Sequence, residues 1–120
     1  MNLFRWLFAW RSIRSEATHR YRLGLVRDKK GDSEGAIAAY SSAISLDNAP
    51  DDVKAMALYN RALLFDAQGD HGKAAADLNA VMDMPTSVRG VTDAARRRLD
   101  RLQRRHDAAA SAQAQRKSTL

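Results

Sequence analysis

The sequence contains no cysteine, which excludes disulfide bonds, thiolate metal sites and thiol nucleophiles. This absence fits a reducing compartment, and we expect a cytoplasmic protein. Long apolar runs are also missing, because the most apolar stretch, residues 3–10, contains Arg5 and is far shorter than the ~20 apolar residues that cross a bilayer. The stretch is a poor signal peptide as well, since Arg11 and Arg14 follow it without an evident small-residue cleavage site.

The usual signatures of catalysis and cofactor binding are missing too. His19, His71 and His106 lie on different predicted elements and lack the spacing of metal ligands. The glycines occur mainly at predicted helix turns, and none belongs to a glycine-rich phosphate loop. We therefore expect a protein that is not an enzyme and that has no cofactor and no metal site.

The net charge of +6 hides an uneven distribution. Residues 1–30 carry eight basic and two acidic side chains, whereas residues 31–85 carry three basic and nine acidic ones. Residues 86–120 are again basic, with nine basic and three acidic side chains. An acidic middle between two basic ends suggests that the ends and the middle contact different partners, or each other.

Two stretches of the chain, 38 residues apart, follow the same plan. Residues 17–46 align with residues 55–84, and many of the paired positions are identical. The identical pairs include Ala17 with Ala55, Tyr21 with Tyr59, Leu25 with Leu63, Asp28 with Asp66, Gly31-Asp32 with Gly69-Asp70, and Ala36 with Ala74. An internal repeat of this length predicts an array of identical supersecondary units, which forms binding surfaces rather than catalytic clefts.

Apolar residues spaced three and four apart predict two helices in each stretch. These helices are expected over residues 15–30, 33–46, 52–68 and 71–84. Each pair is separated by a Gly-Asp turn, in which glycine ends one helix and aspartate caps the next. Pro50 and Pro85 mark the ends of the two units.

The regions on either side of the repeats are predicted separately. Residues 87–106 form one more helix, with a narrow apolar stripe opposite a basic arc. Residues 107–120 are rich in Ala, Ser and Gln, and we expect a flexible tail there. Residues 1–14 form an aromatic and basic N-terminal helix or arm.

The repeated pattern resembles the tetratricopeptide repeat, a helix–turn–helix unit of about 34 residues. The matching positions are Leu23-Gly24, Ala36, Tyr40 and Ala43 in the first unit and Ala62, Phe65, Ala74 and Val81 in the second. The resemblance implies an all-α, right-handed superhelical array over residues 15–106, with repeat one at about 17–50, repeat two at about 55–85 and a capping helix at about 87–106. Three features depart from the family pattern. The repeats are 38 residues apart, and Arg20 and Arg27 stand where large apolar residues are usual. The sequence also contains two complete units, whereas repeat arrays usually need about three to bury a continuous core.

In this family the first helix of each unit lines a groove that binds peptides or helices. The corresponding residues in this sequence are Tyr21, Leu25, Asp28, Met56, Tyr59, Asn60, Leu63 and Asp66. The resemblance implies a non-catalytic protein-binding module, an adaptor or assembly factor, whose groove takes an apolar, basic segment along an acidic edge. The alternative is that the Tyr and Leu residues belong to the core. Asn60 also matches the asparagine that holds a C-terminal carboxylate in chaperone-binding members, although Leu25 stands where its partner is expected.

The N-terminal arm leaves three interpretations open. It caps the repeats, it contacts a protein partner or a second copy in a homo-oligomer, or it lies in a membrane interface and anchors a peripheral protein there. Its large apolar residues are Phe4, Trp6, Leu7, Phe8 and Trp10.

The last predicted helix carries a basic face. Its members are Arg97, Arg98, Arg101, Arg104 and Arg105. Such a face meets nucleic-acid phosphates in some proteins, but it is more often simply solvated. No aromatic residues are interleaved for base stacking, and the acidic middle of the chain repels a polyanion, so we do not expect a nucleic-acid partner.

Overall fold

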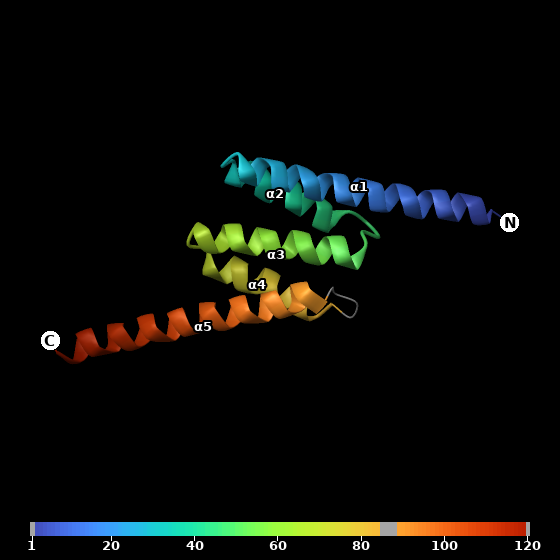
Figure 1. Ribbon diagram of the computed structural model, residues 1–120. Helices are drawn as coiled ribbons and strands as arrows, with labels where there is room; N and C mark the ends of the chain where they lie inside the picture. The colour runs from blue at the N-terminus through green and yellow to red at the C-terminus, as the bar shows by residue number, and fades with distance from the viewer. Residues whose placement is uncertain (1, 85–88, 120) are drawn as a thin grey trace.

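The computed structural model describes residues 2–84 and 89–119 and is helical over most of them. Its helices are α1 (Leu3–Lys29), α2 (Ser33–Ser45), α3 (Asp51–Ala67), α4 (His71–Met82) and α5 (Arg89–Ser118). Each helix packs on the next, so that two helical hairpins and a fifth helix follow one another in an array (Figure 1). α3 also contacts α1 and α5, so the first helices of the two hairpins and the fifth helix are neighbours along the array. The predicted all-α helical-repeat fold is confirmed.

The two hairpins turn in the same way. Gly31 and Gly69 have φ values of 82° and 83°, a left-handed conformation that glycine adopts without steric cost. The next residue caps the following helix, since Asp32 accepts a hydrogen bond from the Gly35 amide at 2.9 Å and Asp70 accepts one from the Lys73 amide at 3.1 Å. The Gly-Asp pairs of the sequence therefore set the geometry of both units.

The helices of each hairpin approach closely because small residues lie where they cross. Gly24 of α1 faces the ring of Tyr40 on α2, whose side chain is fully buried. In the second hairpin Ala62 and Leu78 take the corresponding places and are buried in one cluster. Each unit therefore combines a small residue on its first helix with a large one on its second.

Arg20 and Arg27, which stand where the family pattern has large apolar residues, bind backbone oxygens of α2. Arg20 Nη1 donates a hydrogen bond to the Ser42 carbonyl oxygen at 3.2 Å, and Arg27 Nη1 donates one to the Gly35 carbonyl oxygen at 3.1 Å. Their aliphatic stems can cover apolar surface while the guanidinium groups bind backbone oxygen. In the first unit, two arginines therefore join α1 to α2 at positions where the family usually has apolar residues.

Four expected boundaries need correction or lie outside the described residues. The arm and the first repeat helix form one continuous helix, α1, so the predicted division near residue 14 is wrong. α5 continues to Ser118, so the predicted flexible tail is wrong for residues 107–118, where several alanines favour helix. The expected stop at Pro85 and helix start at Ser87 lie outside the described residues.

The molecule is elongated, measuring 75 × 31 × 19 Å. The N-terminal part of α1 and the C-terminal part of α5 project from opposite ends of the repeat body (Figure 1). Among residues 2–84 and 89–119, no helix combines the length and the apolar character needed to span a bilayer.

Candidate protein-binding site

Tyr21 and Asn60, two of the predicted groove residues, join α1 to α3. The Asn60 side-chain amide donates hydrogen bonds to the Tyr21 hydroxyl at 3.1 Å and to the Met56 carbonyl oxygen at 2.9 Å. The Tyr21 ring also lies 5.8 Å from the ring of Tyr40, centroid to centroid. Burial raises the pKa of Tyr21, and the hydrogen bond from Asn60 opposes this rise only in part. Tyr21 and Asn60 therefore hold the two repeats together.

Three other predicted groove residues keep exposed apolar surface. Met56 and Leu63 are two helical turns apart on α3, so they lie on the same side of that helix, and both are half-buried. Leu25 is the repeat equivalent of Leu63 on α1 and is 39% exposed. We call Leu25, Met56 and Leu63 the inner row. Tyr59 is half-buried and packs against the core of the second hairpin.

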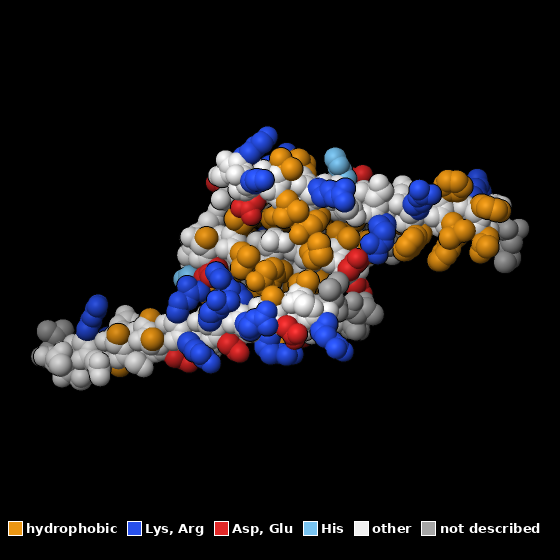
Figure 2. Space-filling view, viewed as in Figure 1, with side chains coloured by type: hydrophobic (Ala, Val, Ile, Leu, Met, Phe, Trp, Pro, Cys, Tyr) orange, Lys and Arg blue, Asp and Glu red, His pale blue; other side chains and the backbone are white. Residues whose placement is uncertain are grey.

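Hydrophobic side chains gather in the middle of one face of the molecule. Figure 2 shows them over α3, between the lysine and arginine side chains of α1 and those of α5. This apolar centre with basic flanks is the surface against which an extended or helical segment of another protein could pack.

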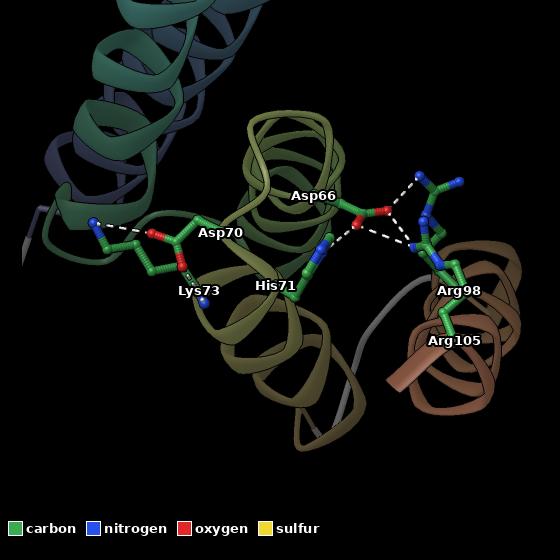
Figure 3. A network of polar contacts seen from close by, with 6 residues as sticks. All are labelled: Asp66, Asp70, His71, Lys73, Arg98 and Arg105. Carbon is green, nitrogen blue, oxygen red and sulfur yellow. Dashed lines mark hydrogen bonds and ion pairs between the residues drawn. The ribbon is translucent and has the colours of Figure 1, made fainter. Parts of the chain in front are cut away.

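Asp66, expected at the acidic edge of the groove, is instead buried in a polar network. Its side chain is 3% exposed. Arg98 Nη2 donates to Asp66 Oδ2 at 2.8 Å, and Arg105 Nη2 donates to both carboxylate oxygens at 3.1 and 2.9 Å (Figure 3). His71 Nδ1 lies 2.8 Å from Asp66 Oδ1. The prediction that Asp66 lines the groove is therefore wrong, whereas its repeat equivalent Asp28 is exposed.

The network holds the Asp66 carboxylate in its charged form. Burial acts to raise the pKa of Asp66, but hydrogen bonds from Arg105, His71 and Arg98 outweigh this effect and lower the pKa below its ordinary value. The charged carboxylate joins α3 to α5 and to the start of α4 (Figure 3).

The predicted basic face of α5 is divided between two environments. Arg98 and Arg105 bind Asp66, although the Arg105 side chain remains 58% exposed. Arg97, Arg101 and Arg104 are exposed. The sequence could not separate the two sets, because the acidic residue that binds the first set lies 32 and 39 positions away from them.

A second buried ion pair, which was not predicted from the sequence, joins α3 to α4. Arg61 donates to the two oxygens of Asp77 at 2.8 and 2.7 Å and to Ser41 Oγ on α2 at 2.9 Å. Asp77 is 6% exposed, and an aspartate in an otherwise apolar row of α4 was a signal that could have found it. Arg61, like Asn60, is thus engaged within the chain, and the match to chaperone-binding members gains no support.

The arm residues are exposed. Leu3, Phe4, Trp6 and Phe8 have exposed fractions of 70%, 76%, 64% and 69%. The interpretation in which this segment caps the repeats is therefore wrong for residues 3–10, because α1 carries it past the end of α2.

The described residues offer no obvious place for a metal ion. In residues 2–84 and 89–119, no three His, Asp or Glu side chains come together as potential ligands. The charged groups that are close together, such as Asp66 with its arginines, form ion pairs instead.

Comparison with known families agrees with this architecture. Residues 3–53 and 21–84 match the tetratricopeptide repeat family profile in two overlapping segments. Neither a curated protein sequence nor a solved structure matches the chain significantly.

Proposed function

The chain belongs to the tetratricopeptide repeat family, and we propose that it is a non-catalytic adaptor or assembly factor that binds a segment of a partner protein along its inner row. Repeats of this kind stack into extended surfaces that serve protein–protein interaction. A peripheral membrane role, the alternative function, concerns residues 3–13 and therefore a different surface.

The observation that carries the proposal is the exposed apolar surface of the inner row on a rigid base. Leu25 and Leu63 occupy equivalent positions on neighbouring helices, and the hydrogen bond between Asn60 and Tyr21 fixes α1 against α3. A surface that is already ordered loses little conformational entropy on binding, which favours affinity.

The chemistry of the inner row favours a partner segment with two or three apolar side chains. An amphipathic helix presents such residues at intervals of three and four, which suits a row spread over two helices. The surface offers one aspartate to a basic partner, where the sequence suggested two. Asp66 is bound to Arg98 and Arg105, whereas its repeat equivalent Asp28 remains exposed.

The test is a double substitution of the inner row, Leu25→Gln with Leu63→Gln. Tyr21 is unsuitable for this purpose, because it packs on Tyr40 and binds Asn60. A matched control is Val26→Gln, since Val26 is 49% exposed and follows Leu25 on the same helix but points to a different side.

The partner proteins captured from the native organism would be quantified for all three forms. We expect the wild type and Val26→Gln to capture the same partner, and the double variant to capture at least ten-fold less with unchanged helical circular dichroism. Equal capture by the double variant would show that the inner row is not the binding site.

A further inference from the structure

The projecting part of α1 is longer than the repeat fold requires. α1 has 27 residues and α3 has 17, and the repeat offset of 38 places the equivalent of Asp51, where α3 begins, at Ile13. About ten residues therefore extend beyond the first unit, a length of about 15 Å in a helix. Residues 3–13 are the helical part of the N-terminal arm that this projection contains, and they form the dark blue end of α1 in Figure 1.

The arm exposes aromatic side chains on opposite sides. Trp6 and Trp10 lie one turn apart on one side, and Phe4 and Phe8 lie one turn apart on the other. With exposed fractions of 64%, 50%, 76% and 69%, and about 200 Å² for each whole side chain, they present about 500 Å² of aromatic surface. This surface is divided between two sides of the helix, and it is contributed by four large aromatic residues within seven positions, whereas single exposed apolar residues are ordinary on soluble proteins.

We propose that the arm binds the interfacial region of an anionic phospholipid bilayer. Acyl chains and headgroups can surround a helix on several sides, as the opposed aromatic pairs require, whereas a single flat protein surface covers one side. Tryptophan and phenylalanine are residues that enter this region, and arginine stems extend so that their charges reach the headgroups.

The charge of the arm selects anionic lipid. Arg5 and Arg11 lie within it, and the first acidic residue of the chain is Glu16, which forms an ion pair with Arg20 at 2.8 Å. Each basic residue held near an anionic membrane strengthens binding by about five-fold.

A second copy of the chain is a weaker candidate for the occupant of this surface. The basic arm would need an acidic surface, and three of the nine acidic residues of the repeat body are already bound to guanidinium groups. These are Asp52 with Arg14, Asp66 with Arg98 and Arg105, and Asp77 with Arg61.

The base of the arm is fastened to the second repeat. Arg14 donates two hydrogen bonds of 3.2 Å to the Asp52 carboxylate on α3, and its guanidinium carbon lies 5.4 Å from the centre of the Trp10 ring. The arm and the first repeat helix belong to the continuous helix α1, and Arg14 links that helix to α3, so a bilayer that holds the arm would also orient the inner row.

The experiment uses the two tryptophans of the chain, Trp6 and Trp10, which both lie in the arm. The full chain would be mixed with vesicles of phosphatidylcholine alone or of phosphatidylcholine with phosphatidylserine, and vesicle flotation and tryptophan emission would be recorded. We expect flotation and a blue shift with the phosphatidylserine vesicles, and about 25-fold weaker binding for Arg5→Gln with Arg11→Gln.

Two variants locate the binding surface while both tryptophans stay in place. Phe4→Ser with Phe8→Ser should abolish flotation and the blue shift, with folding unaffected because both phenylalanines are exposed. Arg97→Gln with Arg101→Gln removes the same number of charges from α5 and should bind as the wild type does. Equal losses in this variant and in the arginine variant of the arm would overturn the proposal.

Two further results would contradict it. Absence of flotation with anionic vesicles excludes lipid as the occupant of the arm. A blue shift that grows with protein concentration without vesicles, together with a doubled mass in light scattering, would assign the arm to a second copy of the chain.

Discussion

The close packing between Gly24 and Tyr40 makes Gly24→Ala the sharpest test of how the first repeat is built. A Cβ atom at position 24 would lie 3.0 Å from Tyr40 Cζ and closer still to Cδ1 and Cε1. The Tyr40 ring is fully buried between α1, α2 and α3, so it cannot turn away into solvent. The added methyl group must therefore push α1 and α2 apart or distort the ring.

Two effects of opposite sign determine how Gly24→Ala changes the free energy of unfolding. Replacing glycine by alanine inside a helix favours folding by about 1 kcal/mol. Overpacking a tight core costs about 1–3 kcal/mol, and this contact, with a rigid ring, belongs at the upper end. We expect a net loss of about 2 kcal/mol in the free energy of unfolding.

The second repeat supplies the compensating change. Its equivalent pair is Ala62 with Leu78, which are buried together. Tyr40→Leu alone should destabilise the protein by leaving space, whereas Gly24→Ala in the Tyr40→Leu background should be neutral or stabilising. The two changes should therefore be coupled by about 3 kcal/mol, the clash that only the wild-type tyrosine causes.

Urea unfolding followed by circular dichroism measures all four proteins of this cycle. The matched control is Gly90→Ala in α5, where an added Cβ meets no atom of the described residues within 4 Å and the change should be neutral or stabilising. If Gly24→Ala is as stable as the wild type, or if the two changes are additive, the tight crossing does not determine the packing of this repeat.

Two further predictions concern buried polar groups. Asp66→Asn should weaken the packing of α5 on α3 by about 1–2 kcal/mol, a modest loss because the arginine partners of Asp66 are partly exposed to solvent. Trypsin should then cleave α5 faster than in the wild type, and an unchanged cleavage rate would contradict the prediction. The pKa of Asp66 is lowered in the folded state, so the ion pairs of its carboxylate stabilise the packing of α5 above the ordinary pKa of 3.8. This stabilisation is lost as the pH falls through the folded pKa, and Asp66→Asn should lack that loss. Tyr40→Phe should leave stability unchanged or raise it by up to ~1 kcal/mol, because no described group hydrogen bonds with the buried Tyr40 hydroxyl. Burial, then the charge of Asp28 and the influence of Tyr21, raise the pKa of Tyr40 from 10.0 to about 12, so wild-type stability should fall as the pH rises through this range, and a similar fall in Tyr40→Phe would argue against Tyr40 as its cause.

The sequence predicted the local features of the fold because they depend on neighbouring residues. The Gly-Asp turns appear as a left-handed glycine followed by an aspartate cap in both units. The periodicity of apolar residues located α2, α3 and α4 to within a few residues. Interactions between positions i and i+4 and the capping of helix ends are visible in a short window of sequence, and they survive packing here.

The predictions that were wrong concern helix boundaries and the burial of Asp66, which depend on the continuity of the backbone helix or on contacts between residues far apart in the sequence. No glycine or proline separates the arm from the first repeat, and the aromatic composition alone suggested a boundary that the backbone does not need. The tail lacks a core to pack on, yet its alanines sustain a helix as far as Ser118. The position of Asp66 depended on two arginines of α5, and spacing within α3 could not indicate that contact.

The repeat places aspartates at equivalent positions, but the neighbouring helix gives them different surroundings. Arg98 and Arg105 of α5 form ion pairs with Asp66, so the negative charge of this carboxylate is balanced within the protein. Asp28 is one repeat earlier, at the end of α1, and its side chain remains exposed. A groove that uses both repeats would thus have an acidic residue at the α1 end alone. A partner segment would therefore bind along the proposed inner row in one orientation. Its apolar residues would pack on Leu25, Met56 and Leu63, and a basic residue would lie toward Asp28. The reverse orientation would place this positive charge near the arginines of α5.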